Sequence, residues 1–518
     1  MPKTETIDRK ESLLFGMSID EIVKEDDVVR FLYDFVSSED LKALGFKNTK
    51  TETREGRPAK SMEVKLTLLL YGYMIKVRSF RDLERLSKRD IGGLWITGMK
   101  GIDHNTLWKF VKNNRDALEK LLAKSVLLAI RLDMVDYAIQ ALDGTKITAD
   151  ASSQSDVWKN ELEFLIETIE EPAKKSAETY MKSLIDEKEK GGKEPPSIPR
   201  KLKGRKMRDK IKNALDTMND KEKARILNRA KSVHELMEKR GVEVINETDT
   251  DSRIMKNREG KRLGYNCQVV REARSGIIVA ADVTDSASDQ KQFVGMASQA
   301  YRNIGIDENK GGYDKTKGPL ILADAGYLSM DQLGKAANKH INFLVNSTKQ
   351  IRDKRKNAFH QINFKRDHKT DTLTCPKGGI LRYIKDVKQW RPNQPGHTAR
   401  VFKCEDYKTC SFRQQCSKSP RGRTVAISKY AEIYEDNLAR GQTHEGMDLI
   451  KKRKTIVENF FGHIKHNQGF RRVSFRGLKA VSTQWKLICT TFNLSKTYQK
   501  WKNMTLSDRK SLIPALSG

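Results

Sequence analysis

The N-terminal part of the chain carries apolar side chains at the spacing of amphipathic helices. Residues 64–77 present a dense apolar face, and the helical period continues to Ile91. Residues 103–106, Asp-His-Asn-Thr, offer N-cap side chains ahead of another amphipathic segment at residues 107–130. We therefore predict an all-helical N-terminal domain over residues 1–135.

The pattern then changes to short strands. Residues 138–148 have strand character, and Asp143-Gly144 lies inside this segment. Residues 265–270 and 277–283 flank an Arg-Ser-Gly turn, which is the pattern of a β-hairpin. This change of period predicts that an α/β domain follows the helical one.

A continuous apolar run at residues 319–323 ends at Asp324. Such a run, with a polar group at its C-terminal end, is typical of a buried central strand. A helical segment at residues 289–303 precedes it, a strand follows at residues 341–345, and residues 442–500 return to a helical period. The order strand, hairpin, helix, strand, strand, helix fits an RNase H-like core, in which helices flank a mixed sheet.

Two charged segments interrupt the α/β pattern, and we interpret both as insertions. The first, residues 156–244, is rich in Lys and Glu and mostly helical in pattern, so we interpret it as an inserted helical arm or hairpin whose charge runs face solvent. The second, residues 351–436, is basic and cysteine-bearing. The predicted catalytic core is then assembled from residues 136–155, 245–350 and 437–505.

Charge narrows the class of partner. The chain has 99 Lys and Arg against 68 Asp and Glu, a formal net charge of +31 with a pI of about 9.7. A polyanionic partner explains this excess, because each neutralised phosphate releases a counterion. The alternatives are a basic ribosome-associated protein and a merely soluble basic protein, and we favour a nucleic acid as the partner. The short helices with basic faces suggest that the N-terminal domain binds DNA, with a plain packing domain as the alternative.

The sequence also predicts where the protein works. Its longest apolar run, Leu66–Ile75, has about ten residues, whereas a membrane-spanning helix needs roughly 20. The N-terminus lacks the apolar segment of a secretory signal. We therefore expect a cytoplasmic, nucleoid-associated protein, whose six cysteines are free or metal-bound rather than paired in disulfides.

Three acidic residues fall where an RNase H-like core brings carboxylates to one edge. Asp143 lies in the first strand, Asp324 ends a buried strand, and Glu458 lies on a C-terminal helix. Phosphodiester cleavage needs an activated water and stabilisation of negative charge, which two divalent ions roughly 4 Å apart supply. The ordinary alternative for each acid is a capped turn or a surface salt bridge. Asp324 is the strongest case, because an Asp that closes an apolar strand is costly without a partner or a metal.

Four blocks of sequence occur in a characteristic order. They read Leu142-Asp143-Gly144-Thr145-Lys146, Gly264-Tyr265-Asn266-Cys267-Gln268, Leu322-Ala323-Asp324-Ala325-Gly326-Tyr327, and residues 453–465 around Glu458. The N-terminal domain adds Gly56-Arg57-Pro58 and residues 78–84. Together these blocks resemble the bacterial insertion-sequence transposases of the DDE class, in particular the group numbered eleven eighty-two. The resemblance covers most of the chain outside the two insertions.

This resemblance implies that Asp143, Asp324 and Glu458 are the catalytic acids and that they hold Mg²⁺ or Mn²⁺. It also implies a DNA transposase that binds the terminal inverted repeats of an insertion sequence and cleaves the ends by metal-dependent hydrolysis. The 3′ ends would then join target DNA by transesterification, with a homodimer holding two ends. The alternatives on the same fold are a domesticated DNA-binding protein and a nuclease without strand transfer.

The candidates for DNA contact come from the N-terminal domain and from the segment around Glu458. Lys465 fits the related pattern Tyr-x2-Arg-x3-Glu-x6-Lys, in which the Lys contacts end DNA, but Lys451 and Lys454 replace the Tyr and the Arg. Arg453, one residue earlier, is then the candidate for the Arg role. The full set is Arg57, Arg78, Arg81, His104, Arg453, Lys465, Arg471, Arg472 and Arg476.

Two further groups have open roles. Cys375, Cys404, Cys410 and Cys416 lie in the second insertion, where four thiolates can close a tetrahedral Zn²⁺ site. Their irregular spacing leaves reduced, unbound thiols as the alternative. Asp289 follows the hairpin where members of the resembling group also carry an Asp, and we favour a capping role for it at the next helix.

Overall fold

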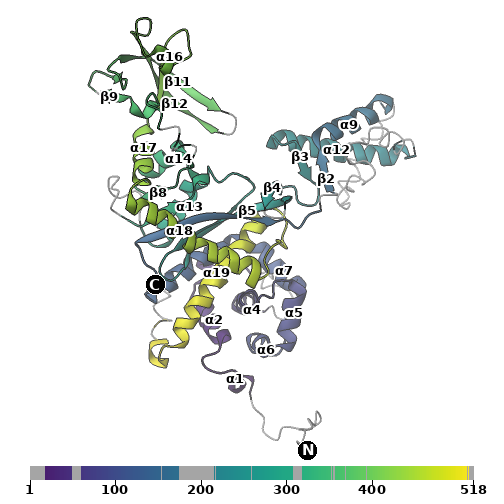
Figure 1. Cartoon of the computed structure of the whole chain (residues 1–518). Coiled ribbons are helices and arrows are strands. Elements are labelled where there is room, and N and C mark those ends of the chain that lie inside the picture. Colours follow the sequence, from purple (N-terminus) through teal and green to yellow (C-terminus); the bar gives the residue numbers. More distant parts are fainter. Residues whose placement is uncertain are drawn as a thin grey trace, which may run out of the picture. The chain divides into compact units, whose positions relative to one another are not determined.

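The structure is a computed structural model, and most of the chain is described in it. The described residues are 18–48, 60–152, 155–173, 215, 217–257, 260–306, 318–349, 351, 353, 356–367, 369–391, 394–509 and 512. The chain divides into two compact units, Met1–Met134 with Lys486–Gly518, and Val135–Trp485 (Figure 1). Each unit is described by itself.

The first unit is helical in its described part, as the apolar period predicts. Asp103 is the N-cap of α7 and accepts the Thr106 N–H at 2.9 Å, which confirms the capping signal seen in the sequence. In α4 the run Lys65–Tyr73 is buried on every side, which explains its dense apolar pattern. The helices are α1 (Ile19–Ile22), α2 (Val28–Ser37), α3 (Leu41–Leu44), α4 (Met62–Met74), α5 (Phe80–Arg89), α6 (Ile91–Thr97), α7 (His104–Asn113) and α8 (Arg115–Arg131).

The C-terminal helix α19 (Leu478–Lys502) belongs to both units. Lys486 forms an ion pair with Glu119 at 2.7 Å, and Asn493 donates to Ser125 at 3.1 Å. Both partners lie on α8. The second half of α19 therefore packs on the N-terminal helices, whereas the sequence assigned residues 437–505 entirely to the core. An apolar helical period shows that a face is buried but does not show against what.

The second unit contains a six-stranded mixed sheet, in agreement with the predicted α/β class. β1 pairs antiparallel with β5 and parallel with β7, which in turn pairs parallel with β8. β5 also pairs antiparallel with β4 and with β6. The strands are β1 (Ile139–Thr148), β4 (Arg253–Asn257), β5 (Gly260–Glu272), β6 (Ile278–Thr284), β7 (Leu320–Ala323) and β8 (Phe343–Val345).

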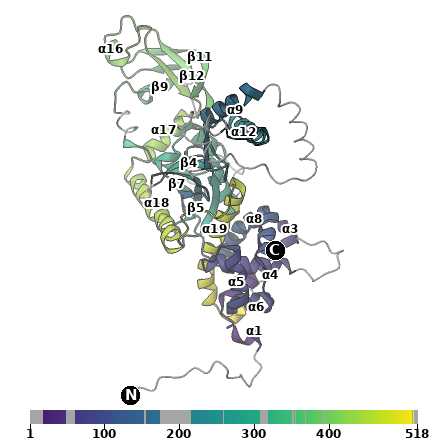
Figure 2. The ribbon, with the colours of Figure 1, turned by 90° about the vertical axis from the view of Figure 1, so that its right-hand side faces the viewer.

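Helices cover both faces of this sheet. Leu344 of β8 belongs to an apolar cluster with Leu449 and Ile450 of α18 (His444–Gly462). Phe343, the preceding residue on β8, packs edge-on against Phe293 of α13 (Phe293–Asn303). Because neighbouring residues of a strand point to opposite faces, α18 and α13 lie on opposite sides of the sheet. Figure 2 shows α18 alongside β7 and β5.

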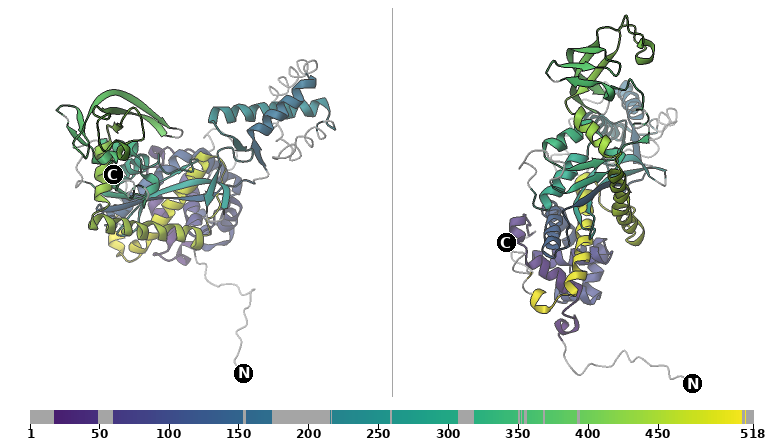
Figure 3. Two further views of the ribbon diagram at one scale, coloured as in Figure 1. Left: turned by 45° about the horizontal axis from the view of Figure 1, so that its top comes forward. Right: turned by 60° about the vertical axis from the view of Figure 1, so that its left-hand side comes forward.

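The first charged segment forms a two-helix arm, in agreement with its helical pattern, and this arm has an apolar interior as well as charged surfaces. α9 (Lys159–Ala173) and α12 (Asp220–Arg240) lie side by side (Figure 3), and β2 (Asp156–Trp158) pairs with β3 (Val244–Asn246) at their base. Leu162, Leu165 and Val233 are among the buried residues of a core that the arm builds for itself. The composition of the arm does not reveal this apolar face, because its Lys and Glu residues outnumber the apolar residues that form the core.

The second charged segment forms a five-stranded antiparallel sheet in the order β13-β12-β11-β10-β9, with a short helix, α16 (Arg413–Cys416). The strands are β9 (Lys365–Asp367), β10 (Thr372–Thr374), β11 (Ile380–Arg391), β12 (Gln394–Cys404) and β13 (Thr424–Ser428). The following helix, α17 (Ala431–Arg440), packs on the main sheet. Its Asn437 side chain bonds both the N–H and the carbonyl of Val345, at 2.8 and 2.9 Å, and so occupies the edge of β8.

Candidate active site

Asp143 lies within β1 as a largely buried carboxylate. One of its oxygens accepts the Gly144 N–H at 2.8 Å, and the other accepts the Arg453 guanidinium at 2.9 Å. Burial raises the pKa of Asp143. The charge of Arg453 opposes this pKa shift, and that of Asp324 adds to it. The ionised form of such a carboxylate needs a cation beside it.

Asp324 comes directly after β7 and begins a short turn, η3 (Ala325–Tyr327), whose Gly326 N–H donates to it at 2.8 Å. β1 and β7 are parallel neighbours in which Ala141 lies opposite Leu322. Asp143 follows Ala141 by two residues and Asp324 follows Leu322 by two residues, so the register brings the two acids side by side just beyond the paired part of the two strands. Adjacent strands are about 4.8 Å apart, and the charge of Asp324 accordingly raises the pKa of Asp143.

Tyr327 is buried beside this pair. Its hydroxyl donates to Gln268 Oε1. Burial first, and then the charges of Asp289, Asp143 and Asp324, raise the pKa of Tyr327 far above its usual range, so it stays protonated as a donor. The ring therefore lies among three acidic residues, at the junction of β5, β7 and the segment before α13.

Asp289 does not cap α13, contrary to the role that we favoured from the sequence. The N-cap of α13 is Gln292, and it makes no side-chain capping bond. Asp289 Oδ1 instead accepts the Lys146 amino group at 3.1 Å, Asn266 Nδ2 at 2.6 Å and Gln268 Nε2 at 2.8 Å. It is the centre of a polar network on β1 and β5.

The sequence motifs include Lys146, Asn266 and Gln268, but the motifs alone assign these three residues no role. The available signal was polar residues at alternate positions, Asn266 and Gln268, inside a buried strand. Gly144 is required beside them, because a Cβ there would clash with the side-chain amide of Gln268. Gly326 lies between two acids. A Cβ added to Gly326 would lie 3.0 Å from Asp324 Oδ1 and 3.6 Å from Asp289 Oδ2.

Glu458 lies on α18, which covers β1 and β7, but its side chain is exposed. It follows Arg453 by five residues, which turns it about 140° around the helix from the residue that reaches Asp143. Glu458 makes no hydrogen bond or ion pair with the residues that the structure describes. The structure thus brings Asp143 and Asp324 together and leaves Glu458 on the same helix as their arginine.

The prediction that Arg453 contacts DNA is not supported by its position. Arg453 is 8% exposed and is bound to Asp143, so its guanidinium neutralises a carboxylate of the site rather than facing a phosphate. The helix is held in this rotation by Arg271, which donates to the carbonyl of Ile456. Sequence spacing cannot show this, because the contact joins residues 310 positions apart.

Lys465 lies in η5 (His463–Asn467), a π-helical turn that continues α18. Its amino group donates to the Lys146 carbonyl on β1 at 3.2 Å. Arg471 is exposed and bonds the Lys465 carbonyl and the His466 ring, at 3.2 and 3.0 Å. Such π turns are frequent at functional sites, and this one holds Lys465 against the strand that carries Asp143.

Arg472 and Arg476 are exposed beyond the C-terminal end of β1. Thr148 forms a parallel β-bridge with Arg472. Arg476 donates to the Asp150 carboxylate at 2.9 Å. Both arginines line a hollow at this end of the strand.

The candidates in the N-terminal domain differ in position. Arg81 is exposed, and Arg57 lies outside the described residues. Arg78 is half-buried, and burial lowers its pKa. His104 is engaged by Glu84, whose Oε2 lies 2.6 Å from its Nδ1 and also accepts its backbone N–H at 3.1 Å.

The four cysteines of the second insertion gather at one end of the five-stranded sheet. Burial is the largest cause that raises the pKa of Cys404 and of Cys416, and the charges of Cys375 and Cys410 add to it, so the four thiols lie within electrostatic range of one another. The N–H groups of Gly379 and Lys377 donate to Cys375 Sγ at 3.2 and 3.4 Å. Cysteine binds metal through its sulfur as the thiolate.

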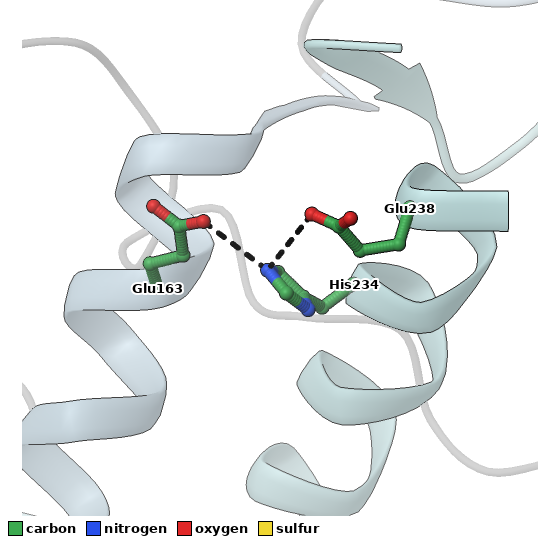
Figure 4. A group of neighbouring side chains, drawn as sticks. All are labelled: Glu163, His234 and Glu238. Carbon is green, nitrogen blue, oxygen red and sulfur yellow. Dashed lines mark hydrogen bonds and ion pairs between the residues drawn. The ribbon is translucent and has the colours of Figure 1, made fainter. Parts of the chain in front are cut away.

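The two-helix arm carries a cluster of polar side chains that the sequence analysis did not identify. Glu163 of α9 and Glu238 of α12 face His234 Nε2 at 3.2 and 4.0 Å (Figure 4). Lys159 also bonds Glu238 and lowers its pKa. With Lys159 included, this partly exposed group is an ordinary ion-pair network between the two helices.

Comparison with known families bears on both units. Residues 17–113 match the model described as Transposase domain (DUF772), and residues 374–498 match the model described as Transposase DDE domain. No curated protein matches significantly. Among the helices that the structure describes, none is long and apolar enough to cross a membrane. The two family matches support a DNA transposase of the DDE type.

Proposed function

We propose that this protein cuts the ends of an insertion sequence and joins their 3′ ends to target DNA, on an RNase H-like core of the group numbered eleven eighty-two. The observation that carries the proposal is the pairing of Asp143 and Asp324 on neighbouring parallel strands, with Arg453 beside them. The sheet order β6-β5-β1-β7-β8 supports the RNase H-like assignment.

The donor set suits a hard divalent cation. Carboxylate oxygens are the protein ligands of Mg²⁺ and Mn²⁺, and a Mg²⁺ site uses few of them because substrate oxygens and water complete it. Asp143 and Asp324 would hold the ion, and we propose Glu458 as the third acid. When bound, the metal stabilises negative charge at the phosphate and lowers the pKa of a bound water.

The residues of the chain contribute position and charge. Arg453 pairs with one oxygen of Asp143 and so opposes the rise in pKa that burial causes. Tyr327 and Asp289, through Gln268 and Lys146, fix the strand segments that carry the two acids. This rigid frame keeps the acids in one geometry through the reaction.

Two displacements complete the proposed reaction. In the first, the oxygen of water bonds to phosphorus at the element end, and the bond from phosphorus to the 3′ oxygen breaks, leaving a 3′-hydroxyl. In the second, this hydroxyl attacks a target phosphodiester and displaces the target's 3′ oxygen. One phosphodiester replaces another, so no external energy source is needed.

The test is cleavage of a duplex that carries an element end, taken from the inverted repeats flanking the gene. We expect Asp143→Asn and Asp324→Asn each to abolish cleavage and strand joining while DNA binding persists, because each removes a metal-binding charge. Full activity in either variant would overturn the assignment. Cleavage without joining would favour a nuclease, and binding without cleavage by the native chain would favour a domesticated DNA-binding protein.

The same assay decides the third acid. We expect Glu458→Gln to abolish cleavage, while Glu445→Gln, an exposed acid in the first turn of the same helix, leaves it unchanged. If Glu458→Gln is fully active and Asp289→Asn is dead, Asp289 takes the place of Glu458. Loss of activity in the Glu445 variant would show only that α18 tolerates no change of charge.

A further inference from the structure

A hollow of about 650 Å³ opens where β1 ends. Its walls come from four separate segments of the second unit: the end of β1 and the residues after it, the segment after β3, the β4–β5 hairpin and the stretch before α19. The lining residues are Thr148, Asp150, Ala151, Ser152, Ser155, Thr248, Lys261, Arg262, Leu263, Arg472 and Arg476.

The lining has the composition of an anion site. Lys261, Arg262, Arg472 and Arg476 contribute four positive charges, and Asp150 contributes one negative charge, so the net charge of the lining is +3. Asp150 is already paired with Arg476. The other polar lining residues are Ser and Thr, whose hydroxyls donate to phosphate oxygens.

The backbone beneath the hollow is fixed by bonds between distant segments. The Thr148 N–H donates to the Arg471 carbonyl at 3.1 Å, the Val473 N–H to the Thr148 carbonyl at 2.9 Å, and the Ala149 N–H to the Leu263 carbonyl at 3.0 Å. These three bonds tie the end of β1 to β5 and to the stretch before α19. The cations therefore extend from a rigid rim, and an anion does not have to order it.

We propose that this hollow binds a backbone phosphate of the DNA whose scissile phosphate lies at Asp143 and Asp324. The inference rests on the proposed function and adds a second, non-catalytic contact to it. β1 links the two places, because Thr148 follows Asp143 by five residues, or about 17 Å of strand. Phosphates rise by 3.4 Å per nucleotide along the duplex axis, so a separation of about 17 Å places the bound phosphate at most about five nucleotides from the cut.

The exposure of the cations favours duplex DNA over a small phosphate. Lys261, Arg262 and Arg472 are all exposed at the surface, so they can reach a continuous backbone that runs past the rim. The net charge of +31 also draws a polyanion rather than a single anion. Contacts of this kind position DNA and are indifferent to base sequence.

The first experiment is a salt titration of binding to a random-sequence duplex, without divalent metal. We expect Lys261→Gln combined with Arg472→Gln to flatten the slope of log affinity against log salt by about 0.9, the loss of one phosphate contact. The matched control removes two charges from exposed positions of α12, as Lys221→Gln with Lys239→Gln, and should keep the native slope. Melting temperatures of all three proteins establish that they are folded.

An unchanged slope in the Lys261/Arg472 variant would overturn the inference, as would an equal loss in the α12 control. Weaker binding of inorganic phosphate alone, with an unchanged DNA slope, would show a small-anion site and overturn it too. Because this titration needs no cleavage, its result is independent of the proposed catalysis. A protein that never cuts DNA would refute the proposed function and leave the slope measurement standing.

The second experiment locates the phosphate. Neutral methylphosphonates are placed singly along the end duplex, and we expect one that lies within about five nucleotides of the cut to weaken binding of the native chain. The same substitution should have no effect on the Lys261/Arg472 variant, which has already lost the contact. An interference pattern identical in the two proteins would overturn the inference.

Discussion

At the residue scale, the candidate site is a balance of buried charges. Asp143 is largely buried and lies beside Asp324. Burial and the charge of Asp324 both raise the pKa of Asp143, and the positive charge of Arg453 opposes this pKa shift. Asp289 is balanced in the same way by Lys146. Removing one partner of a buried pair leaves the other uncompensated, so changes here affect the fold as well as the chemistry. Binding and melting therefore have to be measured beside activity.

Glu84 offers a residue-scale prediction in the helical unit. Bonds from Lys88 first, and then from His104, lower the pKa of Glu84 to about 2. A carboxyl whose pKa is depressed by folding stabilises the folded state above its unfolded pKa, and this stabilisation disappears as the pH falls through the folded value. We expect Glu84→Gln to lower the melting temperature at neutral pH, and the difference from the native chain to vanish as the pH approaches 2.

Melting curves across this pH range check the prediction. The control is Glu63→Gln, which changes a partly exposed acid in the first turn of α4. No bonds comparable to those of Glu84 are seen for Glu63 in the described residues. Asp40→Asn would be a poor control, because Asp40 caps α3. A loss of stability in Glu84→Gln that is independent of pH would contradict the explanation by charge and indicate lost packing instead.

At the element scale, strand register decides which side chains meet. Asp143 and Asp324 are adjacent because β1 and β7 pair in parallel with Ala141 opposite Leu322. A shift of one residue would point one of the acids to the other face. In the second insertion, β10 and β12 similarly end at the cysteines, and this is why widely spaced thiols gather at one place.

These cysteines give an element-scale prediction, namely one structural Zn²⁺ per chain held by Cys375, Cys404, Cys410 and Cys416. Four thiolates form a closed tetrahedral site, which contributes directly to folding. We expect Cys410→Ser to lower both the zinc content and the melting temperature, and Ser411→Ala, the neighbouring exposed residue, to change neither. Metal analysis of the purified protein decides, since a metal-free chain of equal stability would leave the thiols unbound.

At the scale of the whole molecule, charge governs assembly. A net charge of +31 makes two chains repel each other, and DNA that binds both would neutralise that charge. The proposed reaction needs two element ends held together. Charge repulsion between free chains and the need to hold two element ends together are both satisfied if two chains associate only on DNA.

We therefore predict that the chain is a monomer alone at low salt and that two chains assemble with two end duplexes. Mass measurement in solution, with and without the duplex, tests this prediction. A random-sequence duplex of equal length is the control and should bind without giving the two-chain, two-duplex species. A stable dimer in the absence of DNA would contradict the role that we assign to charge.

The sequence by itself determined the elements whose signals are local. Apolar period distinguished helices from strands, Asp103 marked the start of α7, and the run before Asp324 marked β7, because these features depend only on nearby residues. The acids Asp143 and Asp324 could be chosen in the same way, from their places on strands. Glu458 was a weaker candidate from its place on a C-terminal helix, and the family resemblance added to it.

Only the tertiary structure decided how these elements face one another. Arg453 meets Asp143 across 310 positions, Asp289 meets Lys146 across 143, and α19 divides its packing between two units. Each outcome depends on the rotation of a helix or the register of a strand, which the packing of distant segments sets together. A periodic pattern indicates that one face of an element is buried. Which distant segment packs on that face is decided only when the chain folds.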